Sequence, residues 1–126
     1  MKIEKRVMER GKGADLRERA FVFACAVLEL HRELYHREPV VRGVSLQATS
    51  AAGSVGANLE EADAAQSRPD FISKCSISLK EARESRYWLR MLHTTLKLPR
   101  IEPLITESTE LIAILTTIVK KSRRQP

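Results

Sequence analysis

Apolar and small side chains recur along this chain at alternating steps of four and three residues, the period of one face of an α-helix. The pattern fills four segments, residues 15–36, 40–66, 67–96 and 102–122. The second segment carries the smallest side chains, on a stripe of Val41, Ser45, Ala48, Ala52, Val55, Leu59 and Ala62. The fourth carries the most aliphatic stripe, made of Leu104, Ile105, Ser108, Leu111, Ile112, Leu115, Ile118 and Val119. The strand-like alternation of period two is absent, so we expect an all-α fold.

Capping residues predict where these helices begin and end. Asp15 with Glu18 three residues later, and Ser67 with Asp70, fit helix N-caps. Pro99 stops the third helix shortly after Leu96. Connections of a few residues between helices of about 20 residues favour an antiparallel up-down-up-down four-helix bundle. In that topology the first helix begins and the last helix ends at the same pole.

A chain of 126 residues suits a single domain. We expect a bundle over residues 15–122, preceded by a basic arm, residues 1–14, and followed by a short basic tail, residues 123–126. The net charge of +6 is uneven, because residues 1–14 contribute +3 and the group Lys120, Lys121, Arg123 and Arg124 contributes +4. Electrostatic partners are therefore expected at the chain ends.

The second helix has a further face of small residues, Thr49, Gly53, Gly56 and Ala57. Each glycine inside a helix costs about 1 kcal/mol relative to alanine, so close approach of another helix is the expected compensation. Asn58, Glu60 and Tyr87 are candidates for contacts that fix the register or join subunits. This face predicts a homo-oligomer.

A second group of cations, Lys80, Arg83, Arg86 and Arg90, falls on the third helix with Tyr87 and Trp88 between them. One interpretation is a solvated face of paired charges, such as Lys80 with Glu84. The other is a basic stripe for a nucleic-acid backbone, with aromatic rings available for stacking. We expect Trp88 to be buried and Tyr87 to lie at an interface.

Motifs for catalysis or metal binding are absent, so we expect neither an enzyme nor a cofactor. Cys25 and Cys75 stand alone on apolar stripes and are interpreted as core residues. Glu33 and His36 form one E-x-x-H half-motif, but a di-iron bundle requires two such motifs and two further glutamates. The sequence has no apolar run long enough for a membrane span and no signal peptide, so we expect a cytoplasmic protein without membrane contact.

Several segments together resemble a known family. They are Asp15-Leu16 with Ala20-Phe21, then Ser54-Val55-Gly56-Ala57-Asn58-Leu59-Glu60-Glu61-Ala62, Phe71, Ser78-Leu79-Lys80-Glu81-Ala82 and Tyr87-Trp88-Leu89. Over residues 15–121 the chain resembles the four-helix bundle family also called 23S rRNA intervening sequence protein. The resemblance implies a bacterial cytoplasmic homopentamer. It also extends to the accessory variability protein of diversity-generating retroelements, a basic pentameric barrel that binds nucleic acid and a reverse transcriptase.

Two functional hypotheses follow. The first is a non-enzymatic ring of helical bundles that binds RNA or DNA backbones through clustered lysine and arginine without reading sequence. The alternative is a protein-interaction scaffold without a nucleic-acid partner, whose partner is another protein, such as one encoded nearby.

Overall fold

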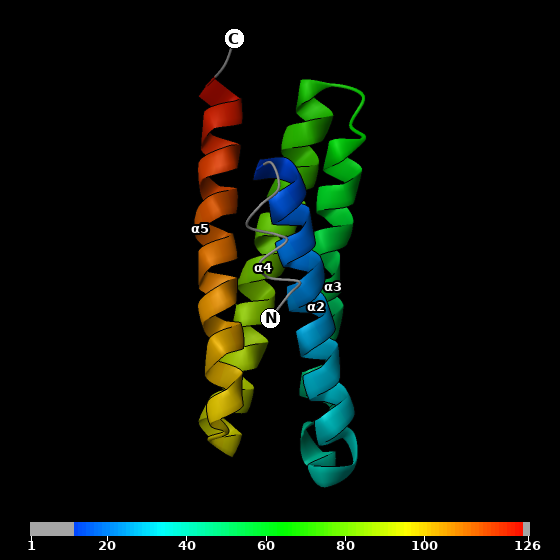
Figure 1. Ribbon diagram of the computed structural model, residues 1–126, viewed down its shortest axis with the longest axis vertical. Helices are drawn as coiled ribbons and strands as arrows, with labels where there is room; N and C mark the ends of the chain where they lie inside the picture. The colour runs from blue at the N-terminus through cyan, green and yellow to red at the C-terminus, as the bar shows by residue number, and fades with distance from the viewer. Residues whose placement is uncertain (1–11, 125–126) are drawn as a thin grey trace.

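The computed structural model describes residues 12–124 of the chain. Its long helices are α2 (Lys12–Arg37), α3 (Arg42–Asp63), α4 (Arg68–Leu96) and α5 (Glu102–Arg124). Short 3-10 turns, η1 (Pro39–Val41) and η2 (Pro99–Ile101), precede α3 and α5. Residues 12–124 contain no strand, and the four helices run up and down in chain order (Figure 1). The expectation of an all-α four-helix bundle is confirmed.

The helices are not equally close to one another. α3 packs along both α2 and α4, and α4 packs along α5, whereas α2 and α5 touch at far fewer positions. The start of α2, the end of α5 and the turn between α3 and α4 lie toward the same end of the bundle (Figure 1). This arrangement matches the shared pole expected from the up-down topology.

The core lies where the four stripes meet. Every residue of the stripe predicted for the second helix is buried, including Ala48 and Ala52 at 0% exposure. Large side chains from the other helices complete the core, such as Phe23, Leu89 and Leu115. Burial of such side chains stabilises a fold by about 1.5–3 kcal/mol each before conformational entropy is counted.

Buried hydroxyl groups in this core find acceptors. Ser78 Oγ donates a hydrogen bond of 2.8 Å to the carbonyl oxygen of Val55, and so joins α4 to α3. Ser85 and Ser108 donate to carbonyl groups of their own helices. Because a buried hydroxyl without a partner is costly, these bonds let small polar residues occupy core positions without destabilising them.

The ends of α4 follow the predicted capping chemistry. Ser67 Oγ accepts a hydrogen bond of 3.2 Å from the backbone nitrogen of Asp70, which confirms Ser67 as the N-cap. The helix ends at Leu96 as predicted, with Lys97 at a φ of 54° in the left-handed conformation of a helix C-cap. Pro99 then begins η2.

Other predictions about the first two helices were wrong. Asp15 is not an N-cap, because α2 begins at Lys12 and places Asp15 in its first turn, where a carboxylate still favours the positive end of the helix dipole. The remainder of the expected arm, residues 1–11, lies outside the described residues. The second helix ends at Asp63 rather than near Gln66, because Ala64 leaves the helical backbone conformation.

The two cysteines differ. Cys75 is buried, as predicted, and burial raises the pKa of its thiol, which keeps it protonated and unreactive. Cys25 is exposed, so its assignment to the core was wrong. It belongs to a second apolar stripe of α2, with Phe21 and Leu28, that points away from the bundle centre. Within residues 12–124, no helix combines the length and apolar character required to cross a bilayer.

Candidate nucleic-acid interface

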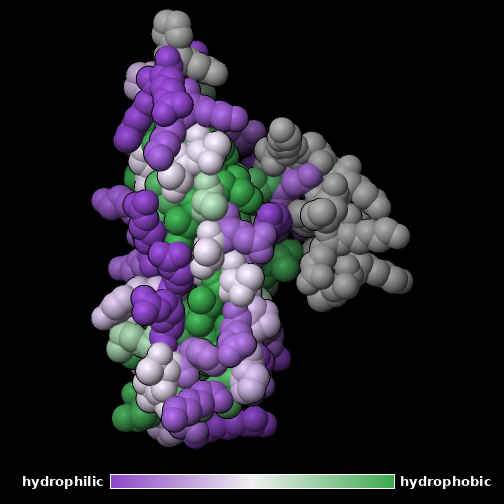
Figure 2. Space-filling model, turned by 90° about the vertical axis from the view of Figure 1, so that its left-hand side faces the viewer, coloured by the Kyte–Doolittle hydropathy of each residue, from purple (hydrophilic) through white to green (hydrophobic). Residues whose placement is uncertain are grey.

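The last turns of α5 carry the cations expected at the C-terminal end of the chain. Lys120, Lys121, Arg123 and Arg124 are all exposed. Positive charge at this position also compensates the negative end of the helix dipole. Figure 2 looks onto α5 and shows hydrophilic side chains gathered over this end of the molecule, above a band of hydrophobic atoms. Among residues 12–124, none of the four pairs with a carboxylate.

The cations of α4 are also accessible. Lys80, Arg83 and Arg90 are exposed and Arg86 is half-buried. The anticipated pair between Lys80 and Glu84 does not form, and the described part of the chain offers no carboxylate within 4.0 Å of any of these four side chains. Their charge is therefore available to an external anion.

These α4 cations line up on the side that faces α5. Arg83, Arg86, Arg90 and His93 follow one another at steps of three, four and three residues, so they share one stripe of the helix. His93 Nε2 lies 3.2 Å from Glu102 Oε1 in the first turn of α5. The stripe consequently borders α5 along its length.

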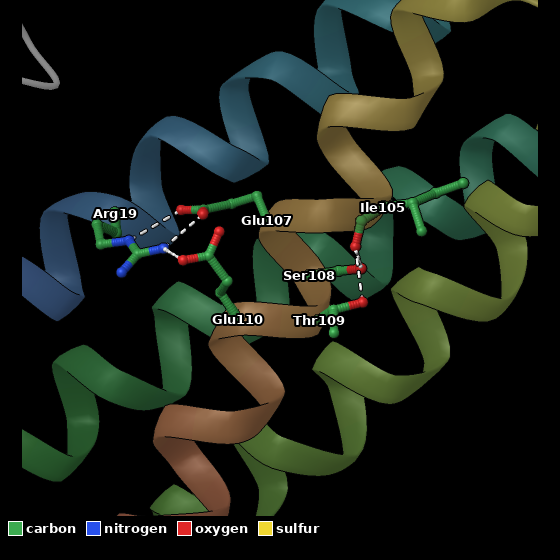
Figure 3. Close-up of polar contacts among 6 residues, drawn as sticks. All are labelled: Arg19, Ile105, Glu107, Ser108, Thr109 and Glu110. Atoms are coloured by element: carbon green, nitrogen blue, oxygen red, sulfur yellow. Dashed lines mark hydrogen bonds and ion pairs between the residues drawn. The ribbon is translucent and has the colours of Figure 1, made fainter.

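Beyond the first turn of α5 the acidic residues, Glu107 and Glu110, point the other way, toward α2. Arg19 of α2 donates hydrogen bonds of 3.0 and 2.5 Å to the two carboxylate oxygens of Glu107, and one of 3.5 Å to Glu110. Figure 3 shows both glutamates reaching Arg19, while Ser108 and Thr109 bond to the carbonyl of Ile105 on another side of the helix. The hydrogen bonds that Arg19 donates to Glu107 raise the pKa of its guanidinium despite partial burial.

This division separates three of the C-terminal cations. Lys121 follows Glu107, Glu110 and Ile114 at helical steps and lies on the flank of α5 that faces α2. Lys120 and Arg123 follow Thr116 on the flank that borders α4. Cations of both helices therefore lie on one side of the molecule, with Lys120 and Arg123 near the start of α4 and the arginines of α4 toward its other end. This surface, the basic face, comprises Lys80, Arg83, Arg86, Arg90, Lys120 and Arg123.

The carboxylates nearest to the basic face on α4 lie toward its other side. Glu81 is half-buried beside α3, where it accepts a hydrogen bond from Ser54. Burial, with the neighbouring charge of Glu84, raises the pKa of Glu81, and the bond from Ser54 and the positive charge of Lys80 oppose that change only in part. Negative charge on α4 is thus turned away from α5.

The residues expected to join subunits occupy a different seam, between α2 and α3. Thr49, Asn58 and Glu60 make contacts within the subunit: Thr49 and Asn58 bond to carbonyls one turn earlier, and Glu60 pairs with Arg17 at 3.4 Å. Gly53 and Ala57 are exposed, and a Cβ added at Gly53 would meet nothing within 4 Å. Tyr87 lies on α4, apart from this group.

Gly56 is the glycine that faces another helix. A Cβ added there would lie 3.6 Å from the Cβ of Ala20, which is ordinary van der Waals contact. At Gly56, α2 and α3 lie as close together as the small residues led us to expect. The space at this position would also accommodate alanine.

The same seam carries exposed apolar side chains whose exposure the sequence analysis missed. Arg17, Phe21, Leu28, His31 and Tyr35 fall on one stripe of α2, and Arg17 and His31 contact Glu60 and Ser45 of α3. Phe21 and Leu28 are 62% and 52% exposed, and Leu46 of α3 is 54% exposed. We call the surface made by Phe21, Leu28, Tyr35, Leu46, Gly53 and Ala57 the apolar face.

The residues considered as metal ligands have structural roles or lie on the surface. Glu33 of the half-motif pairs with Arg100 at 2.6 Å, and His36 is exposed. His31 Nδ1 lies 2.5 Å from Ser45 Oγ. No group of three or more potential metal ligands occurs within the described residues. The largest cavity described, about 430 Å³ between α2 and α5, is open to solvent and bordered by the Glu33–Arg100 pair.

Comparison with known proteins decides the family. The model of the family described as 23S rRNA-intervening sequence protein matches residues 12–117. The chain belongs to this family. A crystal structure of a protein of unknown function from the S23 ribosomal protein family of Bacteroides thetaiotaomicron superimposes with a TM-score of 0.76. The two chains are 37% identical over 83% of this chain and 98% of that one. Among curated proteins, none matches significantly.

Glu81 provides a test of the charge arrangement on α4. Its raised pKa means that the folded state holds the proton more tightly than the unfolded state, so the ionised side chain destabilises the fold above that pKa. Glu81→Gln should therefore raise the urea midpoint at pH 7. The gain should vanish as the pH falls below the ordinary glutamate value of 4.5. Loss of stability at pH 7 would instead show that the bond from Ser54 outweighs the burial of charge.

Proposed function

We propose that this member of the family is a non-enzymatic, oligomeric helical bundle that binds the backbone of RNA or DNA without reading sequence. The observation that carries the proposal is the basic face, where the cations of α4 and α5 lie on one side of the molecule and, among the described residues, have no carboxylate within 4.0 Å. Exposed lysine and arginine bind phosphates mainly by displacing condensed counterions, an effect that is independent of sequence. Such a protein is expected to act in the cytoplasm.

The shape of the basic face supports backbone binding rather than recognition of base edges. The cations lie along two adjacent antiparallel helices, so they form an extended surface and not a single deep pocket. Phosphate contacts position a protein on nucleic acid but carry no sequence information. The family description, which refers to a 23S rRNA intervening sequence, is consistent with an RNA setting.

Assembly into a ring is the second part of the proposal, with five subunits suggested by the family resemblance. The apolar face supports it, because a subunit that exposes Phe21, Leu28 and Leu46 on the side of α2 and α3 is expected to cover them. A ring also repeats the basic face around its axis. The combined positive field would strengthen and accelerate the binding of a long polyanion.

The apolar face equally supports the alternative function, a scaffold for a different protein. In that case the partner covers Phe21, Leu28 and Leu46, and the basic face contributes to solubility. Copurification of a stoichiometric partner with a monomeric protein, together with no retention of RNA, would favour this second function.

Removal of cations from the basic face should weaken binding more than removal of the same charge elsewhere. We expect Arg83→Ser with Arg90→Ser to reduce the slope of log affinity against log salt concentration by about 2. The matched control is Arg32→Ser with Arg37→Ser, which removes two exposed positive charges from α2. Fluorescence anisotropy with labelled RNA over a salt series measures both.

Replacement of Lys120, Lys121, Arg123 and Arg124 by serine extends the same test to α5. Equal losses in the α4 variant and the α2 control would show that total charge, and not the basic face, governs binding. Affinity that does not change with salt would contradict the electrostatic mechanism itself.

Charge placed on the apolar face should disrupt the ring. Leu28→Glu with Leu46→Glu is expected to convert the oligomer to monomers without loss of helical content, because both leucines are about half exposed in the subunit. Ile77→Glu on α4, 38% exposed, is the control and should leave the assembly unchanged. Light scattering on a sizing column gives the mass. A wild-type protein that is monomeric would exclude the ring.

A further inference from the structure

Tyr87 presents an aromatic ring within the basic face. The side chain is 55% exposed, although tyrosine rings usually bury most of their apolar surface. Its ring meets the ring of Trp88 edge-on, with centroids 5.2 Å apart and an interplanar angle of 75°. Trp88 in turn packs against the hydrophobic core. The exposed ring therefore rests against a neighbour that is only partly buried, so the expected burial of Trp88 is met in part.

A small open cavity lies beside this ring. It has a volume of about 250 Å³ and is lined by Tyr87, Arg90, Met91, Thr94 and Thr95. Cavities that enclose a whole drug-sized ligand usually have volumes of about 300–1,000 Å³. This one suits a single planar ring, with apolar contact from Met91 and hydroxyl groups from the two threonines.

Cations lie one helical turn to either side of Tyr87. Arg83 precedes it by four residues and Arg90 follows it by three, and both spacings make neighbours on a helix surface. Neither arginine pairs with a carboxylate in the described part of the chain. The ring is thus flanked along the helix by two guanidinium groups that are available to phosphates.

We propose that this part of α4 binds single-stranded nucleic acid, with one base stacked on Tyr87 and adjacent phosphates on Arg83 and Arg90. The inference rests on the proposed function and adds the kind of strand that is bound. Bases in a duplex are stacked on one another and cannot reach a ring on a convex helix surface, whereas bases of a single strand are free to do so. Stacking of this kind tolerates any base.

The chain offers a direct probe of this contact, because Trp88 is its only tryptophan and touches Tyr87. A short single-stranded oligouridine and an RNA duplex of the same length are titrated into the full-length protein at low salt. Tryptophan fluorescence reports contact at Tyr87, and anisotropy of a labelled strand reports affinity. The variants are Tyr87→Leu, which removes the ring, and Tyr87→Phe, which retains it.

We expect the single strand to quench Trp88 and Tyr87→Leu to bind it about tenfold more weakly, a change of about 1.4 kcal/mol. Tyr87→Phe should bind it like the wild type, and duplex affinity should be the same in both variants. If both ligands bind but Tyr87→Leu leaves the single-strand affinity unchanged, stacking is overturned and contact with phosphates alone remains. If neither ligand binds at low salt, the proposed function fails together with the inference.

Discussion

The close packing of α3 against α2 and α4 is the constraint on which the rest of the structure depends. The inner side of α3 carries serine and alanine at positions that are completely or almost completely buried, such as Ser45, Ala48 and Ala52. Side chains of this size remove little apolar surface from water, so α3 gains stability only if its neighbours come close enough for dense van der Waals contact. The Ser78 bond to the backbone of Val55 is possible because of that proximity.

The bulk that α3 lacks is supplied from the other helices. Leu89 of α4 and Leu111 and Leu115 of α5 are fully buried, so the hydrophobic stabilisation of the bundle is concentrated there. α5 is joined to the rest mainly through α4, and its sparse contact with α2 is bridged by Arg19 and Glu107. This ion pair draws the acidic flank of α5 toward α2 and leaves the opposite flank basic.

Two outward surfaces of different character result from this arrangement. The basic face runs along α4 and α5, and the apolar face runs along α2 and α3 on the side where small residues bring those helices together. Charge attracts a polyanion whatever its sequence, while exposed apolar surface calls for a protein partner. The division of labour proposed for this protein, with assembly on one side and nucleic acid on the other, follows from the separation of these surfaces.

Much of the fold was predictable because local signals and burial agreed. The stripe of α3 and the Ser67 cap needed only helical period and capping chemistry. The start of α2 was not predictable from Asp15, because a carboxylate is favourable both as an N-cap and within the first turn. Cys25 was misassigned because α2 has two apolar stripes, and the sequence does not indicate which one faces the core.

The candidate site was predictable residue by residue but not as a surface. Exposed cations on α4 and α5 were apparent in the sequence. Their placement on one side of the molecule depends on how α4 and α5 pack, with the end of α4 against the start of α5, as the contact of His93 with Glu102 shows. The sequence analysis grouped Lys121 with Lys120 because they are neighbours in the chain, although the rotation of the helix places them on different flanks of α5. Tyr87 was expected at an interface. Its position between Arg83 and Arg90 is the reason that we propose nucleic acid as the partner at this point.

The most direct test of the account is the stability of Ala52→Leu, compared with the same substitution at the exposed Ala113 of α5. If α3 must lie against its neighbours, the larger side chain at Ala52 should lower the free energy of unfolding in urea by at least about 1–3 kcal/mol. Ala113→Leu should change it by less than about 0.5 kcal/mol. Equal stability of the two variants would contradict the close packing of α3, and with it the origin proposed for both outward faces.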